Sequence, residues 1–188
     1  AMLDPGQAVL VPDPDFTYHG MAARYHHGTV EEFPISKAED FHQSPERVLD
    51  AYDGERMVYL TSPHNPTGSE VTIEEVEQIA AETDEQTLVV VDEAYGEFTE
   101  RESKVELVRE RDDVAVRVNT PFAASEIACR AGLAALDDDE FLEETIETAR
   151  WARKYMHEHL EAETWESGGN FVLTEVGDAS AVADACQR

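Results

Sequence analysis

Two short apolar runs, each followed directly by polar residues, constrain the fold more than any other feature of the sequence. Residues 57–61 and 87–92 are apolar almost throughout and rich in β-branched side chains, which is typical of strands buried on both faces. Between them, Thr72 and Glu75 form a capping-box pattern that begins an amphipathic helix. Buried strands that alternate with helices predict an α/β fold, in which a mainly parallel sheet carries helices on both faces.

The remaining elements extend this alternation along the chain, without an internal repeat or a low-complexity linker. Pro34 would keep its strand at a sheet edge, because proline lacks the N–H that a central strand donates. We expect a large domain over residues 1–136 and, from the long helix onward, the start of a small C-terminal domain over residues 137–188. Further strands are expected at residues 9–11, 29–35, 114–118 and 171–175, and further helices at residues 16–25, 45–51, 103–110, 123–136, 137–160 and 180–187.

Polar side chains follow both buried strands at the end where open parallel sheets bind ligands. In SPHNPTG, Pro66 restricts Asn65 to an extended conformation, which would present a fixed amide to a ligand; the same residues also fit a simple turn before the helix. In VVVDEAYGEF, a buried Asp92 needs a partner, and Tyr95 could aim at the same place. Taken alone, Asp92 is better explained as a helix N-cap. Taken together, the two motifs predict one site.

The charge of the chain restricts its partners. Forty-two acids against fourteen bases give a net charge of -28, while the hydrophobic content is an ordinary 41%. These numbers predict a folded protein with an acidic surface, suited to a salt-rich cytoplasm, where screening acts within about 3 Å at molar salt. Binding to nucleic acid or to anionic lipid is not expected. The two cysteines indicate no disulfide framework, and no apolar run approaches the roughly 18 residues of a membrane span.

The two polar motifs together resemble the signature of class I/II aminotransferases, which use pyridoxal phosphate (PLP). Three further stretches are similar to the same family, so that the resemblance covers nearly the whole chain: PGQAVLVPDPDFTYHGMAARYHHG, NTPFAASEIACRAGLAAL and SGGNFVL. Within the family, the chain is most similar to the histidinol-phosphate aminotransferases of halophilic archaea. The resemblance implies the type I fold of PLP-dependent transferases, a cytoplasmic homodimer, and amino-group exchange between histidinol phosphate and 2-oxoglutarate or glutamate in histidine biosynthesis.

The resemblance also implies roles for individual residues. Asp92 would pair with the protonated pyridine nitrogen of PLP, which keeps the ring an electron sink. Asn65 and Tyr95 would hydrogen-bond the phenolic oxygen of the ring. Phe16 would stack on the ring face, with Tyr18 as the alternative, and Asn170 would lie near the substrate.

The chain departs from the family at the catalytic lysine, which forms a Schiff base with PLP. The family carries that lysine after the next strand, with a serine before it and an arginine that binds the phosphate. Here the strand DDVAV runs straight into RVNTPFAAS, so we expect an internal deletion near residues 116–117. The lysines at 37, 104 and 154 are expected in a polar loop, at a surface helix and on a charged helix, and none replaces the missing one. No catalytic residue is therefore assigned.

Two further expectations and two alternatives follow from the same comparison. We expect the family's glycine-rich phosphate loop before residue 1 and its substrate-clamping arginine after residue 188. Either the missing segments belong to a fuller protein, or the polypeptide lacks them and has negligible transaminase activity. The alternatives are a threonine-phosphate decarboxylase-like enzyme and a non-catalytic remnant of the fold.

A metal site is not expected at His19, His26, His27 or the HEH triplet, because their spacing brings no ligand set together.

Overall fold

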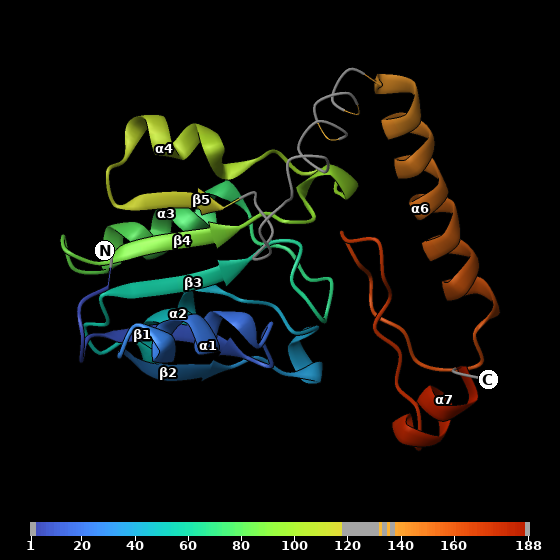
Figure 1. Cartoon of the computed structure of the whole chain (residues 1–188), viewed down its shortest axis with the longest axis horizontal. Helices are drawn as coiled ribbons and strands as arrows, with labels where there is room; N and C mark the ends of the chain where they lie inside the picture. The colour runs from blue at the N-terminus through green and yellow to red at the C-terminus, as the bar shows by residue number, and fades with distance from the viewer. Residues whose placement is uncertain (1–2, 118–131, 133–134, 136–137, 187–188) are drawn as a thin grey trace.

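The computed structural model describes residues 3–117, 132, 135 and 138–186. A five-stranded sheet of order β2-β1-β3-β4-β5, parallel throughout, forms the body of the molecule (Figure 1). Its strands are β1 (Ala8–Asp13), β2 (Thr29–Pro34), β3 (Met57–Thr61), β4 (Leu88–Asp92) and β5 (Val114–Arg117). The helices are α1 (Tyr18–Tyr25), α2 (Pro45–Ala51), α3 (Ile73–Glu82), α4 (Leu107–Glu110), α6 (Asp139–His159) and α7 (Ala179–Cys186), with 3-10 turns η1 (Lys37–Glu39), η2 (Gly96–Phe98) and η3 (Lys104–Glu106).

Side chains of the central strands are buried on both faces of the sheet, as their apolar sequences predict. In β4, Val89 and Val91 pack into one apolar cluster together with residues of α2, α3 and α4. Val90, between them, points to the opposite face and joins a second cluster that includes Ala23 of α1. Helices therefore cover both faces, and the predicted α/β fold is confirmed. Pro34 ends β2, which is an edge strand as expected.

Local sequence signals explain how the two helices beside β3 begin. Ser44 caps α2 by accepting a hydrogen bond from the backbone N–H of Arg47, with Pro45 at the first helical position. Thr72 and Glu75 form a reciprocal capping box at α3. These caps fix where α3 starts, and its apolar face then buries Ile79 completely against the sheet.

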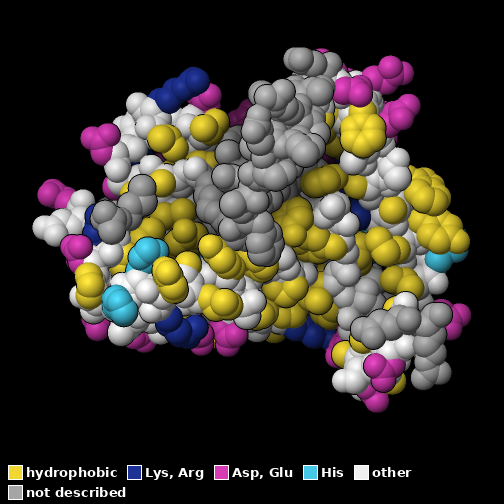
Figure 2. Space-filling model, in the orientation of Figure 1, with side chains coloured by type: hydrophobic (Ala, Val, Ile, Leu, Met, Phe, Trp, Pro, Cys, Tyr) yellow, Lys and Arg dark blue, Asp and Glu magenta, His cyan; other side chains and the backbone are white. Residues whose placement is uncertain are grey.

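The C-terminal part matches the sequence less closely. Helix α6 was expected and is present, but the expected helix at residues 123–136 lies almost entirely outside the described residues. The strand predicted at residues 171–175 was wrong: only an isolated antiparallel bridge between Thr164 and Thr174 forms there. Helix α6 buries none of its residues, and Trp151 and Tyr155 are among its exposed hydrophobic side chains. Figure 2 shows hydrophobic side chains on the surface over α6.

Among the contacts that attach residues 163–175 to the sheet domain are those of Lys37 and Phe41. Lys37 Nζ donates to Glu163 Oε2 at 2.6 Å and also bonds Glu175. The same ammonium lies 5.2 Å from the ring centre of Trp165, whose ring meets that of Phe41 edge to face at 5.4 Å. These contacts bring the C-terminal segment against the loop that follows β2. None of the described helices has the length and apolar character needed to cross a membrane.

Candidate functional site

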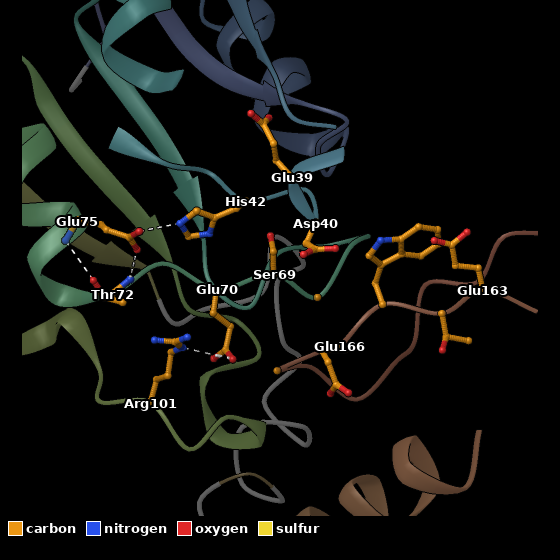
Figure 3. Close-up of a pocket in the computed structure, with 15 residues that line it drawn as sticks. Glu39, Asp40, His42, Ser69, Glu70, Thr72, Glu75, Arg101, Glu163 and Glu166 are labelled. Atoms are coloured by element: carbon orange, nitrogen blue, oxygen red, sulfur yellow. Dashed lines mark hydrogen bonds and ion pairs between the residues drawn. The ribbon is translucent and has the colours of Figure 1, made fainter. Parts of the chain in front are cut away.

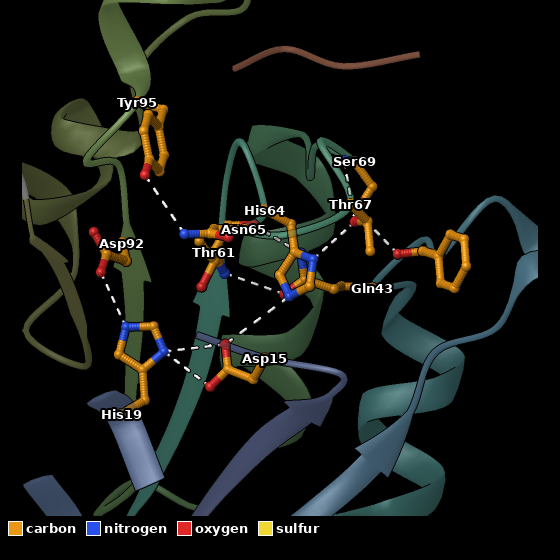
Figure 4. A network of polar contacts seen from close by, with 11 residues as sticks. Asp15, His19, Gln43, Thr61, His64, Asn65, Thr67, Ser69, Asp92 and Tyr95 are labelled. Carbon is orange, nitrogen blue, oxygen red and sulfur yellow. Dashed lines mark hydrogen bonds and ion pairs between the residues drawn. The ribbon is translucent and has the colours of Figure 1, made fainter. Parts of the chain in front are cut away.

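The carboxyl ends of β3 and β4 bring the two polar motifs together. Thr61 and Asp92 are register partners on the two neighbouring strands. Beyond these ends, Asn65 Nδ2 donates to the hydroxyl of Tyr95 over 3.5 Å (Figure 4). Asp92 is 3% exposed, and its Oδ1 accepts a hydrogen bond from the backbone N–H of Ala94 at 3.1 Å. The expected juxtaposition of Asn65, Asp92 and Tyr95 at one sheet edge is thus present in the geometry.

One side chain that bonds Asp92 is His19, at the start of α1. His19 Nε2 lies 3.0 Å from Oδ2 of Asp92, and Nδ1 lies 2.9 Å from Oδ2 of Asp15 (Figure 4). Burial alone lowers the pKa of His19, but hydrogen bonds and charge from Asp15 and then Asp92 outweigh burial and raise the pKa to about 9. At neutral pH the site therefore holds an imidazolium between two carboxylates. Its ring stacks on Tyr59 of β3 at 4.6 Å between centroids.

A second buried histidine, His64, stays neutral beside this cation. Its Nδ1 lies 2.8 Å from the hydroxyl of Thr67, inside the same loop. Burial, followed by the positive charge of His19, lowers the pKa of His64 to about 4. Its Nε2 is 3.9 Å from Oδ1 of Asp15, too far for a direct hydrogen bond. Because His64 is uncharged at neutral pH, it forms no ion pair with Asp15. The carboxylate of Asp15 pairs with the imidazolium of His19 instead.

The SPHNPTG loop has two cis peptide bonds and one residue with a positive φ angle. The peptide bonds before Pro63 and Pro66 are cis. Gly68 has φ +82°, and a Cβ there would lie 2.7 Å from Cα of Ser167, so no other residue fits without a shift. The N–H of Gly168 donates to the carbonyl of Gly68 at 2.9 Å. The SGGNF segment is therefore packed directly against the loop that carries Asn65.

The other predicted site residues lie at different depths. The ring of Phe16 meets the ring of His19 edge to face at 5.7 Å, whereas Tyr18 is 37% exposed. Of these two aromatics, Phe16 is the one in ring contact with the histidine that bonds Asp92. Asn170 is exposed, but its neighbour Phe171 packs edge to face on Tyr95 at 5.1 Å. The SGGNF segment thus reaches the site through Phe171.

Two parts of the site were missed by reasoning from sequence. His19 was considered only as a metal ligand; the available signal was the acid Asp15, which stands four residues earlier, just before the helix that carries His19. Lys104 was expected at the surface, which was wrong: it is 1% exposed, and its Nζ lies 3.2 Å from Oγ of Ser62 and 3.7 Å from Oε1 of Glu93. Burial lowers its pKa, which the Glu93 carboxylate opposes only in part.

A separate cavity of about 720 Å³ opens beside the site, between the start of α3 and residues 163–168 (Figure 3). None of Asn65, Asp92 and Tyr95 lines it. The two basic side chains that line it each contact a carboxylate: Arg101 lies 3.5 Å from Glu70, and His42 lies 2.6 Å from Glu75. The rest of its charged lining is carboxylate, so the cavity does not suit an anionic ligand. In the described ranges no three His, Cys, Asp or Glu side chains are grouped so as to hold a metal ion.

Comparison with known proteins places this geometry in a family. Residues 1–118 match the family model of aminotransferase class I and II. The histidinol-phosphate aminotransferases of Natronomonas pharaonis and Haloarcula marismortui are each 59% identical over 217 residues, covering 100% of this chain. The alignments cover 61% and 60% of those relatives, so the chain spans about three fifths of their length. Since 217 aligned positions exceed the 188 residues here, at least 29 positions of each relative have no counterpart inside this chain. That agrees with an internal deletion, while its location near residues 116–117 stays a prediction.

Solved structures share the fold. Histidinol-phosphate aminotransferase from Sinorhizobium meliloti, in complex with pyridoxal-5'-phosphate, superposes with a TM-score of 0.80 at 22% identity, over 97% of this chain and 59% of that one. Aspartate aminotransferase from Thermus thermophilus with maleate gives 0.79 at 24% identity, over 97% and 60%. At these identities the likeness concerns the fold, and it extends through the C-terminal segment. The family match over residues 1–118, more than half of the sequence, shows that the chain belongs to the class I and II aminotransferases.

Proposed function

We propose that the chain forms the pyridine-binding part of a PLP site in an aminotransferase of the histidinol-phosphate type. The observation that carries the proposal is the buried Asp92 carboxylate, held by the His19 imidazolium at the sheet edge where Asn65 meets Tyr95. The fuller protein would exchange the amino group between histidinol phosphate and 2-oxoglutarate or glutamate. Relatives at 59% identity that carry the name of this enzyme support that choice of substrate.

The side chains present fit the cofactor ring in charge and in hydrogen bonding. The carboxylate of Asp92 would accept a hydrogen bond from a protonated pyridine nitrogen, and His19 and the Ala94 N–H fix its orientation. Asn65 Nδ2 and the Tyr95 hydroxyl would both donate to the phenolic oxygen. Phe16 would cover one ring face. When bound, the cofactor supplies an electron sink for charge that develops at the substrate carbon.

The chain offers no lysine to this arrangement. Lys37 and Lys154 are exposed, with side-chain accessibilities of 47% and 76%, and Lys104 is held by Ser62 and Glu93. This observation favours a second candidate, a cofactor-holding domain without transaminase activity. We propose that the chain as given holds the ring without a covalent bond, and that turnover of histidinol phosphate with 2-oxoglutarate is negligible. A rate near that of ordinary aminotransferases would refute this part.

Pyridoxamine phosphate is the suitable probe, because it needs no lysine and cannot form an imine with surface amines. We expect the chain to bind it in molar potassium chloride, with an affinity read from the change in its fluorescence. Asp92→Asn removes the charge that faces the ring nitrogen, and we expect binding weaker by about tenfold or more. Asp50→Asn, an exposed change of the same chemistry on α2, is the matched control. Equal affinities for the Asp92→Asn variant and the unmodified chain would refute the assignment.

Three wider statements belong to the same proposal. We propose a division into a PLP-binding domain over residues 1–136 and a partial small domain over residues 137–188, which limited proteolysis near residue 137 would test. A homodimer is proposed from the family likeness and is checked by sedimentation in molar salt. A salt-rich cytoplasm as the working environment is supported by the net charge of -28 and by halophilic relatives.

A further inference from the structure

Lys104 is unusual because it places an ammonium group inside a protein whose other two lysines are exposed. The side chain is 1% exposed, and the structure gives it two polar contacts, Oγ of Ser62 at 3.2 Å and Oε1 of Glu93 at 3.7 Å. Moving an ammonium out of water is costly unless a charge and hydrogen bonds compensate for it. The ammonium group of Lys104 therefore restricts the positions of Ser62 and Glu93, just as these two residues restrict its own position.

Those two groups follow the two strands that carry the proposed site. Ser62 comes directly after Thr61 at the end of β3, and Glu93 comes directly after Asp92 at the end of β4. Successive side chains of a strand point to opposite faces. Asp92 faces His19 of α1, while Glu93 faces η3, where Oε1 accepts from the backbone N–H of Lys104 at 2.8 Å and Oε2 from the Ser103 hydroxyl at 2.5 Å. Lys104 therefore contacts the end of β4 on the face of the sheet opposite to the face where Asp92 bonds His19.

The loops that begin at these two positions carry the rest of the site. Asn65 follows Ser62 by three residues, Tyr95 follows Glu93 by two, and the side chains of Asn65 and Tyr95 meet at 3.5 Å. Oγ of Ser62 also accepts the N–H of Val71, which fixes the far end of the Asn65 loop. A single ammonium thus connects the starting points of both loops.

We propose that Lys104 is a positioning residue that sets the spacing between the Asn65 loop and the Asp92–Tyr95 turn, and thereby the fit of the cofactor ring between them. The inference rests on the proposed function, because it names the device that holds that same site in register. It assigns Lys104 no contact with the ring and no chemical step.

Lys104→Met tests this, because it keeps the length of the side chain and deletes only the ammonium. Deleting one partner of a buried ion pair leaves the Glu93 carboxylate without its cation and should lower the free energy of unfolding, although Glu93 keeps its hydrogen bonds from the Lys104 N–H and the Ser103 hydroxyl. If Lys104 only stabilises the fold, the folded variant should bind pyridoxamine phosphate as the unmodified chain does. A positioning role predicts that affinity for pyridoxamine phosphate falls about tenfold. Ser62→Ala removes the other half of the contact and also the acceptor of the Val71 N–H, so it should weaken binding at least as much. Adding Lys104→Met to Ser62→Ala should then cost little more. Lys154→Met, on the exposed side of α6, is the control and should change nothing.

A second measurement needs no cofactor. With 3-fluorotyrosine incorporated, the fluorine resonance of Tyr95 is assigned by its loss in Tyr95→Phe. It should shift in Lys104→Met and in Ser62→Ala, and it should not shift in Lys154→Met. If the unmodified chain binds no pyridoxamine phosphate and yet the resonance shifts, the proposed function fails while the positioning of the turn by Lys104 stands. If affinity and resonance are both unchanged in the two variants, the inference about Lys104 is overturned. Should Lys104→Met not fold, Lys104→Gln, which removes the charge and keeps a polar end, decides in its place, because Ser62→Ala also releases the N–H of Val71.

Discussion

The ion pair of His19 with Asp15 and Asp92 predicts that stability depends on pH in an unusual window. The folded pKa of His19 is about 9, above the ordinary value of 6.5. A cation whose folded pKa is raised stabilises the fold fully below pH 6.5, and this contribution is lost as pH rises through 9. We therefore expect the free energy of unfolding to fall as the pH rises from 6 to 9.5, with the loss complete only above the folded pKa of about 9.

The size of the effect follows from the same two values. The difference between 6.5 and about 9 corresponds to about 3 kcal/mol, at about 1.4 kcal/mol for each tenfold change in proton affinity. His19 is 4% exposed and both carboxylates lie within 3.1 Å of its ring nitrogens, so salt should screen the interaction far less than a surface pair. A loss of this order is a large part of the stability of an ordinary domain.

Urea unfolding in molar potassium chloride, followed by tryptophan fluorescence at pH 6 and pH 9.5, measures the effect. His19→Gln keeps a polar side chain that cannot ionise. The free energy of unfolding of this variant should therefore not show the fall of about 3 kcal/mol between pH 6 and pH 9.5. His26→Gln, at an exposed histidine, should behave like the unmodified chain. Groups that titrate in this range independently of His19 are common to all three proteins and cancel in the comparison. Identical pH dependence in His19→Gln and the unmodified chain, or a His19 ring resonance that titrates near 6.5, would refute the reasoning.

Three further predictions concern the fold. Ile79→Ala removes a fully buried side chain of α3, and urea unfolding should show a loss of about 2–5 kcal/mol; a loss below about 1 kcal/mol would mean that α3 is not packed as described. Thr72→Ala breaks the capping box of α3 and should cost about 1 kcal/mol, whereas Thr72→Ser should restore most of it. With a net charge of -28, the melting temperature should rise as potassium chloride increases from about 0.1 M to about 1 M, because the screening length falls from about 10 Å to about 3 Å; a melting temperature independent of salt would contradict this.

Local sequence signals predicted the parts of the fold that local physics determines. The apolar run at residues 57–61 and the cap at Thr72 each act over a few residues, and both lie where expected. The sheet edge that gathers Asn65, Asp92 and Tyr95 was predictable as well, because parallel strands end at the same edge.

Partners distant in sequence were not predictable in this way. The contact of His19 with Asp92 spans 73 residues, and that of Lys104 with Ser62 spans 42. A lysine inside the charged stretch ERESKVE looks solvated, and only the packing of η3 against the strand ends buries it. The expected strand at residues 171–175 has suitable side chains, but in the described structure it gains one bridge and no neighbouring strand to complete a ladder.

The outer side of β5 has a consequence for how copies of the chain meet one another. In the described part of the chain, β5 pairs only with β4, and an edge strand of this kind can pair with an extended segment of another molecule. In dilute buffer, the repulsion between these acidic molecules keeps them apart and so prevents pairing at that edge. The ions that relieve repulsion within one molecule relieve it between molecules too. Thermal resistance and colloidal solubility should therefore respond to added salt in opposite directions, and the most favourable salt concentration is a compromise between them.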